Sequence, residues 1–209
     1  MTGTGTPSPP TGYDVSKPVH AGGSDCHITV GFDKQLAHIP RFLVQFHYQT
    51  DTNPVRWDAI ARIDHNETSV MGHDVYKEGL HVDVDRRSSE EVHLMLAHSP
   101  LPPNRGKVIR GCVDYFRQEK SYFIDVYEER IVPGGPPKWS DGGKNTYNFI
   151  RRNTIEENMS QESPIEDSLS PDELTELLAD ATGTTAEEID EGASDLKIAS
   201  PEGATVVDE

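Results

Sequence analysis

Apolar and polar residues alternate along short stretches between residues 26 and 97. The stretches are 26–32, 41–49, 55–64, 79–84 and 91–97. A period of two is typical of strands with one buried and one exposed face. Turn-forming segments such as Asp51–Pro54 and Arg86–Ser89 separate the stretches, which predicts a small antiparallel sheet of four or five strands.

The hydrophobic period changes after Asn104, which can cap a helix. Gly111 lies within the stripe of this helix and indicates close packing against the sheet. Residues 121–131 fit either a second helix or a last strand, and we favour the helix. The sequence therefore predicts an α+β fold in which a C-terminal helix or helix pair covers one face of the sheet. The expected core comprises Val44, Phe46, Trp57, Ala59, Ile63, Leu80, Val82, Leu94, Leu96, Val108, Ile109, Cys112 and Phe116.

Composition divides the chain into four parts. Residues 1–24 are rich in Pro and Gly and are expected to be disordered. The α+β domain is expected to span residues 25–132. A Pro- and Gly-rich linker follows over 133–160, within which Tyr147 to Arg152 could fold back on the domain. Residues 161–209 read as an acidic, mostly disordered tail that could be removed without unfolding the domain.

One helix signal stands out in the tail, near residues 171–181. Ser170 can act as N-cap, Pro171 occupies the first turn, and Glu173 completes a capping box. An apolar stripe of Leu174, Leu177, Leu178 and Ala181 follows. Gly183 is expected to end the helix, and Thr185 to cap a shorter turn.

Charge and targeting signals restrict the protein's surroundings. Of the net charge of −17, residues 161–209 carry −14, so the acidity belongs mainly to the tail and repels nucleic acid and anionic membranes. The surplus of carboxylates suits a halophilic archaeon, although an acidic tail on a mesophilic domain explains it equally well. No secretion signal and no long apolar run is found, which predicts a cytoplasmic protein without membrane contact. Cys26 and Cys112 form no metal-binding or disulfide pattern.

Candidate chemistry is concentrated between residues 62 and 85. Arg62 and Asp64 are expected on one face of a strand, and His81 and Asp83 on the same face of its neighbour, with His73 in the loop between. Paired strands bring such side chains to about 5–8 Å of one another. These five residues are the candidate catalytic set. They could bind a divalent cation, or cleave an RNA phosphodiester with a His base and an Arg that stabilises phosphate charge.

Simpler roles compete with these. The same residues would serve equally as the solvated face of a sheet in an acidic protein. His93 would share the face with His81 if the hairpin pairs them. Arg105, Lys107 and Arg110 could touch phosphate or simply form an exposed helix face. No nucleotide-binding, zinc-ribbon or hydrolase motif occurs, so no cofactor is expected and a metal is neither indicated nor excluded.

The stretches Trp57–His65, Gly72–Tyr76 and Gly79–Asp83 resemble a small haloarchaeal family of unknown function over about residues 40–140. An Arg-x-Asp strand end followed by a loop and histidines is also similar to TumE-type toxins of bacterial toxin–antitoxin pairs. That resemblance implies a compact α+β domain and growth inhibition relieved by a partner.

Two functions follow as hypotheses. The first is a non-enzymatic interaction or regulatory domain that offers its acidic tail to a protein partner. The second is a toxin-like or stand-alone nuclease that uses Arg62, Asp64, His73, His81 and Asp83, for which nucleic acid is the partner.

Overall fold

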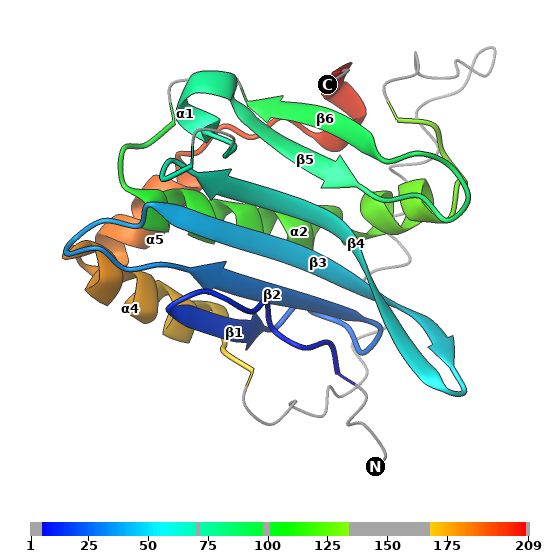
Figure 1. Cartoon of the computed structure of the whole chain (residues 1–209), viewed down its shortest axis with the longest axis horizontal. Helices are drawn as coiled ribbons and strands as arrows, with labels where there is room; N and C mark the ends of the chain where they lie inside the picture. Colours follow the sequence, from blue (N-terminus) through cyan, green and yellow to red (C-terminus); the bar gives the residue numbers. More distant parts are fainter. Residues whose placement is uncertain (1–5, 70–71, 98–100, 134–167, 208–209) are drawn as a thin grey trace.

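A computed structural model gives the fold (Figure 1) and describes residues 6–69, 72–97, 101–133 and 168–207. Seven antiparallel strands form one sheet, and each strand pairs with its neighbours in sequence order. The strands are β1 (Val15–Val19), β2 (Cys26–Phe32), β3 (Arg41–Thr52), β4 (Val55–Asn66), β5 (Leu80–Val84), β6 (Val92–Ala97) and β7 (Thr205–Val207). The expected antiparallel α+β architecture is confirmed, and the sheet is larger than the four or five strands predicted.

Helix α2 (Arg105–Tyr127) lies across one face of the sheet and forms the core with it. Its expected cap is confirmed, since Asn104 Oδ1 accepts a hydrogen bond from the Gly106 amide at 2.8 Å. On this face the ring of Phe46 stacks on Phe116, with centroids 5.7 Å apart, and Phe123 packs against both. Cys112 is fully buried among these residues, and burial raises the pKa of its thiol.

The helix favoured for residues 121–131 is confirmed as far as Tyr127, where it is the continuation of α2 and not a separate helix. Gly111 allows close packing as expected, but the prediction that it packs against the sheet is wrong. A Cβ at this position would lie 2.6 Å from Leu196 Cδ2, so Gly111 admits the C-terminal segment and not the sheet. A short helix, α1 (Val75–Glu78), occupies the connection between β4 and β5 and was not predicted.

A β-bulge in β4 changes which side chains face the core. Phe46 pairs with Ala61 and His47 with Ala59, so Ile60 is an extra residue in β4. Successive strand residues point to opposite faces, so one extra residue changes which of the preceding positions in β4 face the core. Ile60 is fully buried in consequence. The prediction that Trp57 and Ala59 belong to the core is therefore wrong, and both lie half-buried on the opposite face.

The acidic C-terminal segment also differs from its expected disorder. Residues 168–207 contain α4 (Pro171–Thr182), α5 (Ala186–Ser194), the 3-10 turn η1 (Pro201–Gly203) and β7. Both helices pack on α2 and on each other. Leu174, Leu178 and Ile189 are fully buried, because the few apolar residues of this segment fall on one side of each helix.

Local signals for this segment are confirmed. Ser170 and Glu173 form the expected capping box, and Gly183 ends α4 with a φ of 65°. Thr185 and Glu188 form a second capping box that begins α5. The buried Arg110 of α2 donates to Thr175 Oγ1 at 2.8 Å and pairs with Asp190 at 3.3 Å, which connects α2 to both helices.

The N-terminal segment contributes β1 at the edge of the sheet. Val19 is fully buried, and Pro18 is tolerated because β1 is an edge strand. Leu169 exchanges backbone hydrogen bonds with Pro18 and His20 and so covers this edge. Residues 15–19 are therefore ordered, contrary to the prediction for 1–24. The fold-back segment expected at 147–152 lies outside the described residues.

Candidate functional site

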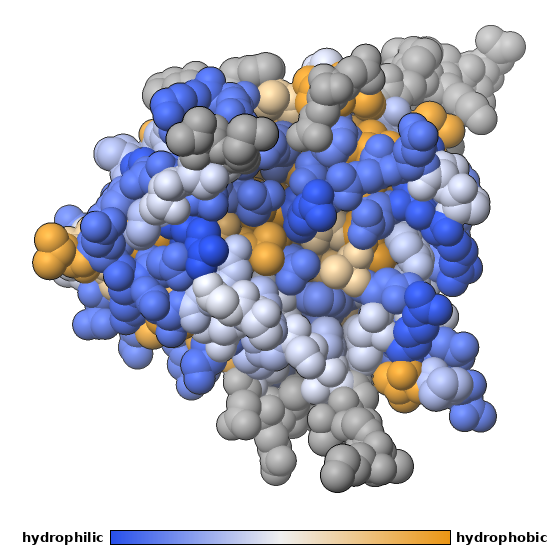
Figure 2. All heavy atoms as spheres, in the orientation of Figure 1, coloured by the Kyte–Doolittle hydropathy of each residue, from blue (hydrophilic) through white to orange (hydrophobic). Residues whose placement is uncertain are grey.

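The face of the sheet opposite α2 is not covered by a helix, and we call it the open face (Figure 1). Figure 2 views this face, where polar side chains surround small apolar patches. Several polar side chains on it are nevertheless buried, among them His27, Thr29, His47, His81 and Asp83. Other side chains lie against some of these residues, since the Trp57 ring meets His27 and the His73 ring meets His81. The predicted site is therefore partly withdrawn from water, whereas the Arg62 side chain is 47% exposed.

Three adjacent strands place Arg62, Asp83 and His93 side by side. The register pairs Arg62 with Asp83 and Asp83 with His93. Arg62 Nε donates to Asp83 Oδ2 at 2.9 Å, and His93 Nδ1 donates to Asp83 Oδ1 at 2.7 Å. Asp83 is therefore held by a guanidinium on one side and an imidazole on the other.

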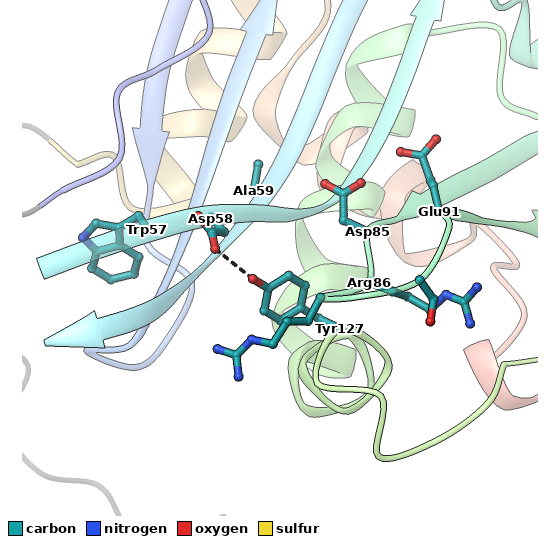
Figure 3. A pocket seen from close by; sticks show the side chains of 9 residues that line it. Trp57, Asp58, Ala59, Asp85, Arg86, Glu91 and Tyr127 are labelled. Atoms are coloured by element: carbon teal, nitrogen blue, oxygen red, sulfur yellow. Dashed lines mark hydrogen bonds between the residues drawn. The ribbon is translucent and has the colours of Figure 1, made fainter.

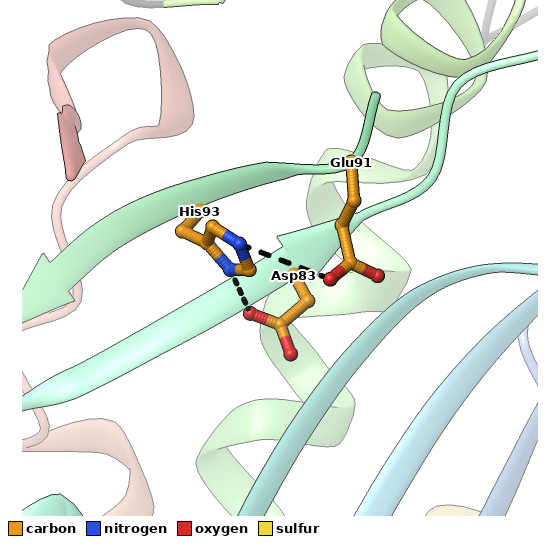
Figure 4. A group of neighbouring side chains, drawn as sticks. All are labelled: Asp83, Glu91 and His93. Atoms are coloured by element: carbon orange, nitrogen blue, oxygen red, sulfur yellow. Dashed lines mark hydrogen bonds and ion pairs between the residues drawn. The ribbon is translucent and has the colours of Figure 1, made fainter. Parts of the chain in front are cut away.

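Glu91 completes this group from the connection that precedes β6. Its Oε1 lies 3.2 Å from Arg62 Nη2 and 3.9 Å from His93 Nε2. Figure 4 shows Asp83, Glu91 and His93 converging from the two neighbouring strands. One possible metal-ligand atom from each of these three residues lies within 4.8 Å of the others. Among the described residues, this is the group of three or more such side chains that is close enough to hold a metal ion.

His73 and His81 form a second pair beside this group. Their ring centroids are 3.7 Å apart, and His73 Nε2 lies 2.8 Å from Glu78 Oε2. His81 Nδ1 donates to the Gly79 carbonyl oxygen at 3.3 Å, which leaves Nε2 as the acceptor of a neutral ring. A cavity of about 220 Å³ connects the two groups and is lined by His73, Glu78, His81, His93, Met95 and Val207.

Burial and neighbouring charges perturb these groups in different directions. Burial would raise the pKa of Asp83, but hydrogen bonds from His93 and Arg62 outweigh it and leave the pKa below its usual value. Burial raises the pKa of Asp64, and the carboxylate of Asp83 adds to this effect. Burial also raises the pKa of Glu91 and, together with His73, lowers that of His81. His81 is thus favoured in its neutral form.

All five residues of the predicted set lie in this region. Arg62 contacts Asp83, and His73 contacts His81, but Asp83 orients His93 and not His81. Asp64 lies near them and acts through its charge. Sequence reasoning placed His93 on this face but left it out of the candidate set, and it missed Glu91. Glu91 and His93 are two positions apart, so in an extended chain their side chains point to the same face, and this spacing could have identified Glu91.

A second, more open pocket of about 360 Å³ adjoins the group and shares Glu91 with it (Figure 3). Tyr127 Oη donates to Asp58 Oδ2 at 2.8 Å at one side of this pocket. Arg86 and Arg87 are also among its lining residues, and Arg87 pairs with Glu128 at 2.9 Å.

The cations at the start of α2 have structural partners. Arg105 stacks over the Tyr76 ring at 3.7 Å and pairs with Glu67 at 2.9 Å. Arg110 is bound by Thr175 and Asp190. These contacts account for both arginines without a phosphate ligand. No helix in the described ranges is long and apolar enough to cross a membrane.

A family model described as a domain of unknown function, DUF7718, matches residues 19–131, and no curated protein or solved structure matches the chain. Because the match covers more than half of its length, the protein belongs to this family. The expected family of unknown function is thus found, while a haloarchaeal source and a likeness to TumE toxins stay predictions. The matched segment contains all the site residues, whereas α4, α5 and β7 lie outside it.

Proposed function

We propose that the open face around Asp83 is an acid–base site that cleaves RNA phosphodiesters, as a toxin-like or stand-alone nuclease. The observation that carries this proposal is the convergence of Arg62, two histidines in ring contact and a carboxylate from β4, β5 and the loop between them. Paired proton-transfer groups beside a guanidinium are what cleavage by an internal 2′-hydroxyl requires.

The roles follow from the hydrogen bonds. His81 Nε2 takes the proton of the 2′-hydroxyl, whose oxygen attacks phosphorus. The bond from phosphorus to the 5′-oxygen breaks, and His73, paired with Glu78, returns a proton to that oxygen. Arg62 stabilises the charge that develops on the phosphoryl oxygens. The products are a 2′,3′-cyclic phosphate and a free 5′-hydroxyl.

Cleavage of a labelled RNA oligonucleotide tests this function, with the DNA analogue as a substrate that lacks the nucleophile. His81→Ala is expected to lower the rate by at least about 10²-fold without changing the thermal unfolding midpoint much. His38→Ala is the control, because His38 pairs with the carboxylate of Glu67 and is not among the residues that line the cavity at His73 and His81. Equal cleavage by the wild type and His81→Ala, or no cleavage of RNA, would contradict the proposal.

The interaction hypothesis has less support in its original form. It has the acidic tail offer a short helix to a partner, and the apolar residues Leu174 and Leu178 of that helix, α4, are buried within the protein. An interaction role would have to use the outward acidic side of this helix, which carries Asp172 and Glu176.

A further inference from the structure

We propose that Asp83, Glu91 and His93 bind one divalent transition-metal ion on the open face. The role of the ion in catalysis rests on the proposed function, but the binding itself rests on geometry. The three residues offer an imidazole nitrogen and two carboxylate oxygens. This mixed set suits Mn²⁺, Co²⁺ or Zn²⁺ better than Ca²⁺ or Mg²⁺, which prefer oxygen ligands alone.

The spacing of the three side chains fits a single ion. Their ligand atoms lie within 4.8 Å of one another. Two ligands on opposite sides of an ion, each about 2.1 Å from it, are roughly 4.2 Å apart. Small side-chain rotations would therefore bring all three atoms to bonding distance. Asp83 and His93 are fixed on paired strands, so the site is preorganised by the sheet.

The local charge also favours a cation. Five carboxylates surround the region, those of Asp64, Glu78, Asp83, Asp85 and Glu91. The guanidinium of Arg62 pairs with two of them, Asp83 and Glu91. A phosphodiester approaching such a surface meets repulsion that Arg62 offsets only in part while its guanidinium pairs with both Asp83 and Glu91. An ion would neutralise these carboxylates.

Arg62 and the ion compete for the same oxygens. The Arg62 side chain is 47% exposed, so it can turn toward solvent without unpacking the core. Binding of the ion would then release the guanidinium toward the anionic substrate. This competition predicts that removing Arg62 strengthens transition-metal binding selectively. On a nonspecific acidic surface, the loss of a cation would strengthen the binding of every divalent ion equally.

Calorimetric titration of the full-length, chelator-treated protein with MnCl₂, ZnCl₂, MgCl₂ and CaCl₂ tests the site. We expect one Mn²⁺ or Zn²⁺ per chain, bound at least about tenfold more tightly than Mg²⁺ or Ca²⁺. His93→Gln and Glu91→Gln should each weaken transition-metal binding by at least about tenfold. Arg62→Gln should strengthen it selectively over Mg²⁺. His38→Gln, in the His38–Glu67 pair, should leave it unchanged.

The outcomes separate this inference from the proposed function. Wild-type binding that is no tighter for Mn²⁺ or Zn²⁺ than for Mg²⁺, or that survives both His93→Gln and Glu91→Gln, overturns the metal site even if RNA is cleaved in chelator. Stoichiometric binding that depends on both residues supports the site even if no RNA is cleaved. Glu91→Gln keeps the test valid if His93→Gln unfolds, because Glu91 lies in a connection before β6.

Discussion

The two faces of the sheet bury their side chains by different means. Against α2, aromatic rings such as Phe46 and Phe116 are sealed by a second layer of structure. On the open face, His47 and Asp83 are also almost inaccessible, yet no helix lies over them. Polar side chains of adjacent strands contact them instead, Thr29 for His47 and both Arg62 and His93 for Asp83. The difference shows how one sheet can keep a dry core on one side and polar groups near solvent on the other.

The helix-covered face should depend most on the C-terminal segment. A chain ending at residue 167 lacks Leu174, Leu178 and Ile189, whose burial contributes roughly 5 kcal/mol or more. That loss is comparable to the stability of a whole domain, so we expect the truncated protein to lose cooperative unfolding. Circular dichroism during urea titration measures this, with a chain ending at Val207 as control. Cooperative unfolding of the 1–167 fragment would contradict this expectation and support the prediction that the tail can be removed without unfolding the domain.

The second largest loss of stability is expected from a single cavity in the core. Phe116→Ala removes a fully buried ring that stacks on Phe46, and we expect it to lower the free energy of unfolding by about 3–5 kcal/mol. Val132→Ala, at a position 78% exposed, should change it by less than about 0.5 kcal/mol. Urea unfolding of both variants measures the contrast, and equal costs would refute the assignment of the core.

Acid should weaken the open face through His47. Burial, together with the neighbouring His27, lowers the pKa of His47 to about 4, and its Nε2 lies 2.9 Å from Thr29 Oγ1. In the unfolded chain this histidine binds a proton near pH 6.5, whereas in the folded protein it stays neutral until about pH 4. The part of the free energy of unfolding that comes from this difference is therefore fully present above pH 6.5 and is lost as the pH falls toward 4. At pH 5 the loss is about 2 kcal/mol.

His47→Gln isolates this contribution, because glutamine can still meet Thr29 but does not titrate. Between pH 7.5 and pH 5, the variant should lose less stability than the wild type. An identical pH dependence of the two proteins would show that His47 is protonated in the folded state.

The smallest effect is expected for Trp57→Ala. Trp57 is half-buried on the open face, where its ring meets His27 edge-on with centroids 4.9 Å apart. We expect a cost of about 1 kcal/mol, well below that of Phe116→Ala. Urea unfolding followed by circular dichroism measures this cost, because the variant no longer carries Trp57 as a fluorescent reporter. A cost of 3 kcal/mol or more would place this ring in a core and contradict the position of the bulge.

The limits of the sequence prediction have particular causes. Alternation correctly predicted strands β2 to β6 and the shared face of Arg62 and Asp83, whereas the short edge strands β1 and β7 were missed. It failed at Trp57 because the extra residue at Ile60 leaves no mark in the hydrophobic pattern. The C-terminal helices were underestimated because average hydropathy conceals a few well-spaced residues such as Leu178 and Ile189. Alternation places Glu91 and His93 on the same face, but their contacts with Asp83 and Arg62 depended on the register of β6, which alternation cannot supply.

The pairing of β7 with β6 has a consequence for biosynthesis. Met95 pairs with Thr205, so the edge of β6 beside His93 stays open until residue 205 and its neighbours have left the ribosome. Contacts this distant in sequence form late, and unpaired strand edges favour association between nascent chains. Residues 205–207 therefore close the sheet next to the candidate site, and the site reaches its final form only after these residues have been translated.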